Sequence, residues 1–130
     1  MKIINEMVVR AVLAFGLIGM SQAVLAEQRV LNADEVAAMF SDKTVWGEHA
    51  FKEKKTMSYF SADGSFTGKQ LDINETTKGK WSVYKKGRLF LERGGDNLCR
   101  KVVDDGGVIK KYKKKKHVFT YTKFEDGNKL

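Results

Sequence analysis

The chain has 130 residues, of which 24 are Lys or Arg and 16 are Asp or Glu, so its formal net charge is +8 at pH 7. This length fits one domain and hardly more. Its single cysteine excludes an internal disulfide framework and any zinc or iron–sulfur site built from cysteines. Hydrophobic residues make up 42% and charged residues 31%, which is typical of globular proteins and excludes a disordered or collagen-like chain.

The start of the chain has the three regions of a secretory signal peptide. Lys2 and Arg10 form a weakly basic start, 11–20 is an uncharged and mostly apolar run, and small residues lead up to Ala26. The apolar run is shorter than the ~20 residues that a membrane-spanning helix needs. We therefore predict cleavage after Ala26, a mature domain over 27–130 without a transmembrane span, and a periplasmic location. An uncleaved membrane anchor is the alternative.

One short helix is expected at about 32–41. Asn32 is a favourable N-cap, and Glu35 stands three residues later, which is the spacing of a capping box. Leu31 and Val36 flank this start as a hydrophobic staple does. Because these local signals agree, the sequence predicts a helix that begins at Asn32.

The remainder, from about 43 to 124, is expected to form short strands separated by Gly-containing turns. The expected strands are 44–46, 51–60, 65–72, 80–84, 88–92, 98–103, 108–112 and 117–124. Their spacing predicts a mainly β fold, in which a meander of about seven or eight antiparallel strands closes or half-closes into a small calycin-like barrel. The helix should plug one end or cover an edge. The polar tail 125–130 is expected to fray.

No motif for catalysis, metal binding or cofactor binding is apparent. His49 and His117 lie in no nucleophile-and-base setting. The acidic turn 104–107 lacks the spacing of a calcium loop and is typical of an ordinary turn. We therefore expect a protein that is not an enzyme and that carries no metal and no cofactor.

The strongest compositional feature is a run of lysines. It comprises Lys110, Lys111, Tyr112, Lys113, Lys114, Lys115 and Lys116. Such a run attracts polyanions. Export argues against nucleic acid, so the partner would be an anionic envelope component, such as a lipid headgroup, or an acidic protein. The favoured alternative is a solubilising hairpin whose lysines protect an edge strand.

Four large aromatic residues are the other candidate site. Trp46, Tyr59, Trp81 and Tyr121 could line a cup for one small apolar ligand inside a barrel. Core filling is the favoured alternative, because a chain of this size needs most of its apolar residues for its core. The expected function is a non-catalytic binding or interaction module. The alternatives are an envelope protein that docks through 110–117, and a plain small-ligand carrier.

Four short motifs lie between Leu31 and Val103: a Leu-x-Ala-Asp-Glu helix start, a Thr-Val-x-Gly segment, a Tyr-Phe-x-x-Asp-Gly hairpin and a Gly-x-Trp strand. Together they resemble a family of small proteobacterial periplasmic proteins known as domain of unknown function 995. The matching residues are Leu31, Ala33, Asp34, Glu35, Thr44, Val45, Gly47, Tyr59, Phe60, Asp63, Gly64, Gly79 and Trp81. The resemblance implies a lipocalin-like small β fold and no activity.

The single cysteine has two interpretations. From its residue type alone we expect Cys99 to be buried and inert, with an intermolecular disulfide as the alternative. The resemblance implies a pair of cysteines, one in the strand after Gly-x-Trp and one later in the chain. Phe90 stands at about the first of these positions, so Cys99 would lack its partner.

Overall fold

A computed structural model describes residues 28–130. The predicted signal peptide, 1–26, lies outside this range. The described residues form one helix, one 3₁₀ turn and nine strands. They are β1 (Gln28–Val30), α3 (Ala33–Phe40), β2 (Lys43–His49), β3 (Lys55–Phe60), β4 (Ser65–Gln70), β5 (Glu75–Val83), η2 (Lys85–Gly87), β6 (Leu89–Arg93), β7 (Asp96–Asp105), β8 (Val108–Lys113) and β9 (Lys116–Asp126). Within this part of the chain, no helix has the length and apolar character needed to cross a membrane.

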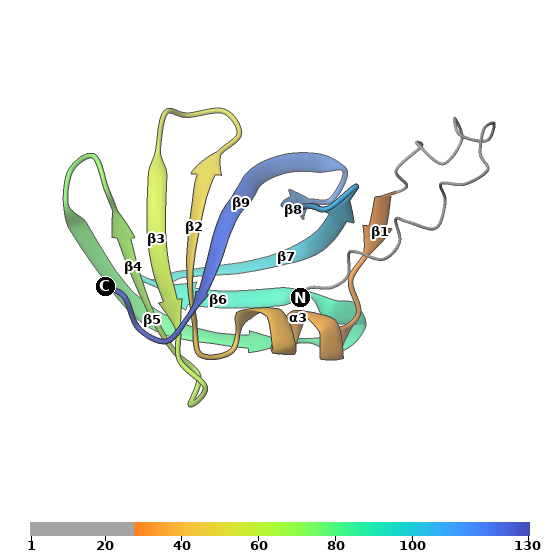
Figure 1. The fold of residues 1–130 in the computed structure, drawn as a ribbon, viewed down its shortest axis with the longest axis horizontal. Coiled ribbons are helices and arrows are strands. Elements are labelled where there is room, and N and C mark those ends of the chain that lie inside the picture. The colour runs from red at the N-terminus through yellow and green to blue at the C-terminus, as the bar shows by residue number, and fades with distance from the viewer. Residues whose placement is uncertain (1–27) are drawn as a thin grey trace, which may run out of the picture.

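Strands β2 to β9 form a closed antiparallel barrel (Figure 1). Strands β2 to β8 pair in chain order, and β9 lies between β2 and β8. Closure depends on β7, which pairs with β6 over 96–100 and with β8 over 101–105. Strand β1 pairs with 103–105 on the edge of β7 that β6 leaves free. The prediction of a mainly β meander with one short helix is confirmed, and the barrel is fully closed.

Helix α3 covers one end of the barrel (Figure 1). Its predicted capping box is present: the backbone N–H of Glu35 donates to Asn32 Oδ1 at 2.9 Å, and the N–H of Asn32 donates to Glu35 Oε1 at 3.0 Å. Leu31 and Val36 are both fully buried in the core. The ring of Phe40 packs edge-on against aromatic rings from β3 and β9. The helix thus seals the apolar end of the barrel.

The predicted strands and tail need four corrections. Strand β3 begins at Lys55, so residues 51–54, expected to be part of this strand, form the loop before it. Strand β5 begins at Glu75, earlier than expected, because its polar first half pairs with β4. The short β1 has no apolar alternation and was not predicted. The predicted frayed tail is wrong, since β9 continues to Asp126 and the next residues bind the buried Thr44. Its hydroxyl donates to Gly127 O at 2.6 Å and accepts from Lys129 N at 2.9 Å.

Cys99 is only partly buried, so the expectation of a fully buried thiol is wrong. Its neighbours Leu98 and Arg100 line the barrel interior, so Cys99 lies on the outer face of β7. Its Cα partner on β6 is Phe90. The Phe90 ring stacks on Tyr84 with centroids 4.8 Å apart and planes at 7°. The cysteine therefore sits beside an aromatic pair on the outside of the barrel.

Candidate functional site

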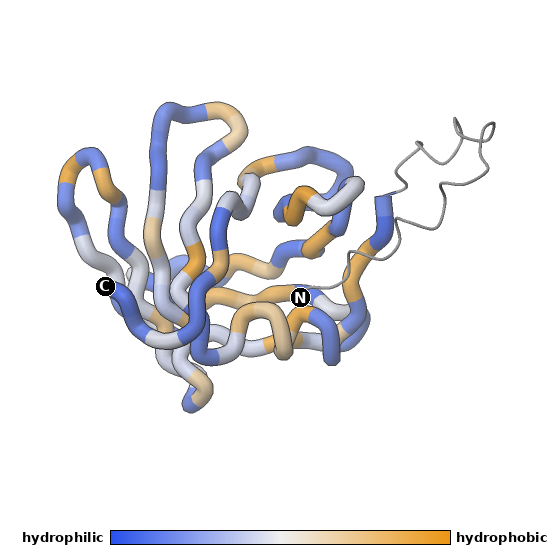
Figure 2. Tube along the Cα trace, in the orientation of Figure 1, coloured by the Kyte–Doolittle hydropathy of each residue, from blue (hydrophilic) through white to orange (hydrophobic). Residues whose placement is uncertain are grey.

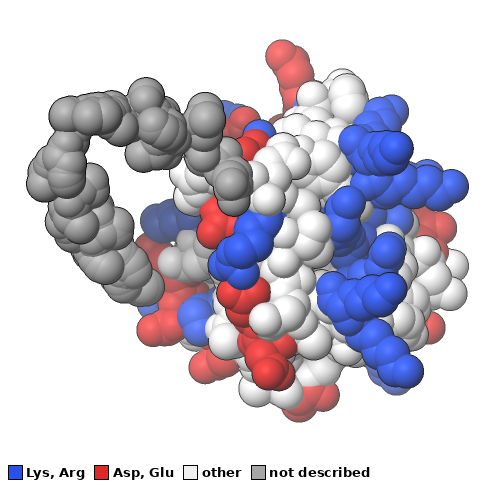
Figure 3. All heavy atoms as spheres, turned by 90° about the vertical axis from the view of Figure 1, so that its right-hand side faces the viewer, with Lys and Arg blue, Asp and Glu red and all other residues white. Residues whose placement is uncertain are grey.

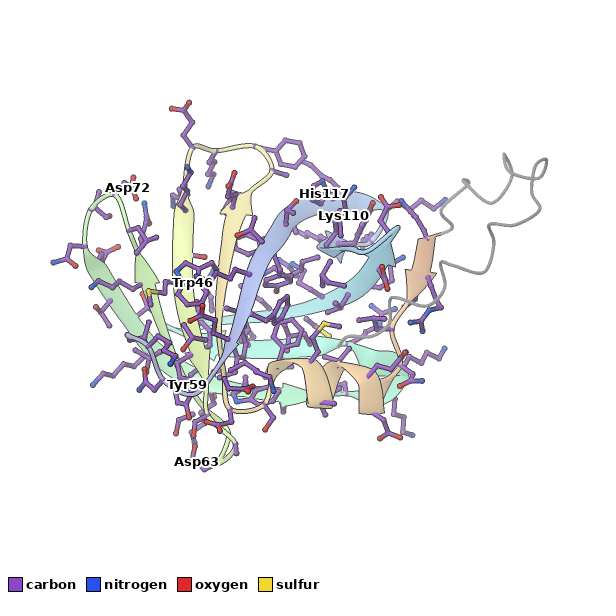
Figure 4. The ribbon with its side chains drawn as sticks, viewed as in Figure 1. Trp46, Tyr59, Asp63, Asp72, Lys110 and His117 are labelled. Atoms are coloured by element: carbon purple, nitrogen blue, oxygen red, sulfur yellow. The ribbon has the colours of Figure 1, made fainter. Side chains whose placement is uncertain are left out.

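The barrel encloses a cavity of about 280 Å³. Figure 4 labels Asp63 near the end that α3 covers and Asp72 at the opposite end, which we call the open end. The apolar wall of the cavity is formed by Val45, Phe60, Phe66, Leu91, Leu98 and Phe119. Exposed Glu75 also lines it, so the cavity reaches the surface at the open end. The interior is therefore apolar toward the helix and polar toward the mouth.

Four basic residues line this cavity: Lys69 on β4 and three on later strands. Arg93, Arg100 and Lys111 come from the neighbouring strands β6, β7 and β8. On its own strand, each of these three lies an even number of residues from apolar residues that face inward, so its side chain points to the same face. No carboxylate within residues 28–130 lies within ion-pair distance of any of the three. The cavity therefore holds these three cations without an ion-pair partner among the described residues, and its acidic residue is Glu75 at the mouth.

Lys111 is a half-buried residue on the inner face of β8. Burial, together with the charges of Arg93 and Arg100, lowers the pKa of Lys111 from 10.5 to about 7. Its Nζ lies 4.8 Å from the ring centroid of Phe119 and 5.9 Å from that of Tyr121. Aromatic faces attract an ammonium group, but they do not replace the hydrogen bonds it loses to water. Near neutral pH this amine is consequently close to half protonated.

Two further polar groups in the cavity lack partners. Among the described residues, nothing hydrogen-bonds to the buried Tyr121 hydroxyl or to His49 Nδ1. Burial raises the pKa of the Tyr121 phenol, so it stays neutral and able to donate. Burial and the nearby Lys52 and Lys111 lower the pKa of His49. Both groups line the same cavity as Lys111, so they remain available to a bound molecule.

A glycine on β2 makes room for the aromatic wall. A Cβ at Gly47 would collide with the ring of Phe119 and would lie 2.7 Å from Thr120 O. The register between β2 and β9 also shifts between Trp46 and Gly47. The missing side chain at Gly47 thus lets the Phe119 ring fill the barrel at this level, beneath the ammonium of Lys111.

The four aromatic residues proposed as a ligand cup do not form one site. Trp46 lies on the outer face, where Lys123 Nζ sits 4.6 Å from its ring (Figure 4). Tyr59 is also outside and donates its hydroxyl to Asp42 (Figure 4). Trp81 is a core residue whose Nε1 donates to Ser61 O at 2.7 Å. Of the four, Tyr121 lines the cavity.

The lysine run is divided by strand alternation. Lys110 points outward and pairs with Asp105 at 2.7 Å, while the next residue, Lys111, points into the barrel. Tyr112 is outside again, and its hydroxyl accepts from Gln28 at 3.3 Å. The remaining residues, 113–116, form the β8–β9 hairpin. The run therefore does not form one continuous surface patch, because its second lysine belongs to the cavity.

Arg93, Arg100 and His49 were missed as site residues. A signal for the two arginines exists in the sequence: Leu89, Leu91 and Arg93 alternate along one strand, as Leu98 and Arg100 do on the next. A charged residue that continues the two-residue alternation of buried apolar residues points into the interior, and such a position indicates a functional site. For His49 we find no comparable signal, since it lies at the end of β2, where the loop begins.

Comparison with known proteins adds no relative: no family model, no curated protein and no solved structure matches the chain. The resemblance to domain of unknown function 995 therefore stays a prediction. Residues 28–130 contain no group of three or more His, Cys, Asp or Glu side chains placed to hold a metal ion.

Proposed function

We propose that the protein is a non-catalytic binding module that takes a small amphipathic anion into its barrel. The observation that carries this proposal is the convergence of Lys111, Arg93 and Arg100 on one cavity, where no carboxylate of the described residues lies within ion-pair distance of any of them. Burying unpaired charge is costly, and a bound anion would offset that cost. The unpartnered Tyr121 hydroxyl would donate a further hydrogen bond to an anionic headgroup.

The wall of the cavity supports an apolar body for the same ligand. Phe60, Phe66 and Leu91 lie between the cationic level and the helix-covered end. Ligand pockets usually measure about 300–1,000 Å³. A cavity of about 280 Å³ is just below this range, so a short alkyl or single-ring body fits better than a long acyl chain. Octanoate is a suitable first probe.

The proposal is tested by titrating octanoate into the purified protein in a calorimeter. We expect saturable binding that Lys111→Met weakens by about tenfold or more, since one ion pair inside the cavity is lost. Lys110→Met is the matched control, because Lys110 lies on the same strand but points outward to Asp105. The control should bind octanoate as the natural sequence does.

The headgroup requirement separates this proposal from a carrier of neutral apolar ligands. Octanol and octylamine share the alkyl chain of octanoate but carry no negative charge. We expect neither to compete with octanoate, because the cavity supplies cations and hydrogen-bond donors. Octanol binding as tightly as octanoate, or equal octanoate binding by the Lys111 and Lys110 variants, would overturn the proposal.

The cellular compartment is a separate part of the proposal. We propose a periplasmic protein on the basis of the signal peptide predicted at 1–26. Native mass spectrometry of protein recovered from the periplasm tests it, with a mass that corresponds to 27–130 as the expected result. A full-length mass in the membrane fraction would contradict cleavage. An additional small mass on the native protein would identify a ligand that was bound in the cell.

A further inference from the structure

Apolar side chains are exposed at the open end of the barrel. Phe51, in the loop between β2 and β3, is 61% exposed. Leu71 and Ile73, in the loop between β4 and β5, are 43% and 57% exposed. Both loops lie at the end opposite α3 (Figure 2). The β2–β3 loop carries one hydrophobic stretch, and the β4–β5 loop carries two that flank a hydrophilic tip. These three residues are large and apolar, yet they take no part in the buried core.

The two loops are held next to each other. The backbone N–H of Leu71, in the β4–β5 loop, donates to Lys55 O at 2.9 Å. Lys55 is the first residue of β3, so this bond holds the β4–β5 loop next to the end of the β2–β3 loop. A hollow of about 810 Å³ is lined by 48–55 together with Leu71 and Asp72. Phe51 and Leu71 therefore border one depression at the mouth of the barrel. We call this pair of loops, 50–54 and 71–74, the apolar rim.

Cationic side chains adjoin the apolar rim. The β8–β9 hairpin presents Lys113, Lys114, Lys115 and Lys116, with no acidic residue among them. Lys116 Nζ lies 4.4 Å from the ring centroid of Phe51, so the hairpin and the rim are in contact. Lys and Arg side chains also gather on one half of the face shown in Figure 3. We call 113–116 the basic hairpin.

From these contacts we infer that the apolar rim and the basic hairpin together dock the open end of the barrel on an anionic lipid surface. Loop-borne aromatic and aliphatic side chains insert at the boundary between headgroups and acyl chains, and adjacent lysines attract acidic headgroups. The rim residues stand on separate loop tips around a hollow, which suits insertion among mobile lipids better than a flat protein interface. The inference goes beyond the proposed ligand binding and stands on different residues.

The first test is co-sedimentation with vesicles. The natural sequence should bind vesicles of phosphatidylcholine mixed with phosphatidylglycerol, bind phosphatidylcholine vesicles weakly, and be released by added NaCl. The triple variant Phe51→Ser, Leu71→Ser, Ile73→Ser should bind the mixed vesicles about tenfold or more weakly. Replacing the four lysines of 113–116 by Ser should reduce binding to the level seen with phosphatidylcholine alone.

Tyr84→Ser is the matched control. Tyr84 is 50% exposed, similar to Phe51, but it precedes η2, which packs against α3 at the other end of the barrel. This variant should bind vesicles unchanged. All variants should bind octanoate as the natural sequence does, so loss of vesicle binding and loss of ligand binding are separate results. Thermal unfolding of each variant shows that the fold is retained.

A second measurement reports insertion directly. Phe51→Trp should show a blue-shifted emission on mixed vesicles, while Tyr84→Trp should show none, each measured against the natural protein, which already contains Trp46 and Trp81. Equal binding to both kinds of vesicle, undiminished binding by the triple Ser variant, or no spectral shift at position 51 would overturn the inference. Salt-sensitive binding that needs the basic hairpin but not the apolar rim would also overturn it, because it would indicate a purely electrostatic partner such as an acidic protein.

Discussion

Two adjacent lysines in this chain have opposite environments. Lys110 and its carboxylate partner Asp105 lie on the outer face, and this hydrogen-bonded contact raises the pKa of Lys110. Lys111 lies inside the barrel without a partner among the described residues, and its pKa falls to about 7. Sequence position differs by one, but strand alternation decides whether the ammonium faces water or the cavity. The pair therefore provides an internal comparison for any experiment on charge burial.

The half-buried Lys111, inside the barrel, should make stability depend on pH. The unfolded chain holds this proton up to about pH 10.5, whereas the folded state releases it near pH 7. Between these values the unfolded state binds more protons, so the free energy of unfolding should rise with pH. Below pH 7 this lowered pKa corresponds to a loss of at most about 5 kcal/mol in the free energy of unfolding. Lys111→Met should remove this loss and the slope.

Urea unfolding between about pH 7 and pH 9.5 measures this effect. His49, whose pKa is lowered below 6.5, titrates beneath this window, and the Tyr121 phenol titrates above it. Lys110→Met should lower stability by an amount that does not vary across the window, because the raised pKa of Lys110 lies above it. A constant difference between Lys111→Met and the natural protein would show that Lys111 is not buried as an unpaired amine.

At the scale of elements, local signals predicted the helix well. The capping box and the staple involve residues within five positions of one another, so Asn32, Glu35 and Val36 determine the start of α3 without tertiary help. The strands needed more information. The apolar Thr44–Val45–Trp46 run gives no alternation, and only pairing with β3 and β9 places Trp46 outside. The inward direction of the Lys111 side chain could not be predicted either, because a run of lysines is typical of a solvated surface.

The register of β6 against β7 leads to a further prediction. Phe90 and Cys99 are direct Cα partners. Such pairs are about 4.5–5.5 Å apart, within the Cα range of a disulfide. Phe90→Cys should therefore oxidise to an intramolecular disulfide. Closing a loop of this length should raise the free energy of unfolding by about 2–3 kcal/mol, because the cross-link lowers the entropy of the unfolded chain. Part of this gain is offset, because the substitution removes the Phe90 ring that stacks on Tyr84.

Thiol titration and mass spectrometry under non-reducing conditions test this prediction. Ser82→Cys is the control, because Ser82 pairs with Phe90 from the far side and so lies two strands from Cys99. Two strand spacings amount to about 9.6 Å, which is too far for a disulfide. The control should keep two free thiols. Two free thiols in oxidised Phe90→Cys would contradict the register of β6 and β7.

For the whole molecule, the two ends of the barrel differ in chemistry. The end under α3 is closed by apolar residues such as Leu31, Val36 and Phe40. The other end holds the mouth of the cavity, the apolar rim and the basic hairpin. The sequence predicts the strands of the sheet, because turns and alternation are local. It does not decide whether the barrel closes, since closure requires β7 to pair with both β6 and β8. The cavity exists only once that closure has formed.

Because Lys111 lines the proposed binding cavity, ligand binding and protonation should be coupled. An anion next to Lys111 favours the charged amine and so raises its pKa above the free value of about 7. At about pH 8 most molecules are unprotonated there, so binding octanoate should take up close to one proton. Octanoate affinity should consequently fall as the pH rises above about 7, by at most about tenfold for each pH unit.

Calorimetry in two buffers of different ionisation enthalpy measures this uptake. At about pH 8 the binding enthalpy in phosphate and in Tris should differ by close to the difference in buffer ionisation enthalpy, and at about pH 6 the two should converge. Lys111→Met should show little difference at either pH, and Lys110→Met should behave as the natural sequence does. Tight octanoate binding without proton uptake at about pH 8 would place the anion away from Lys111 and next to Arg93 or Arg100.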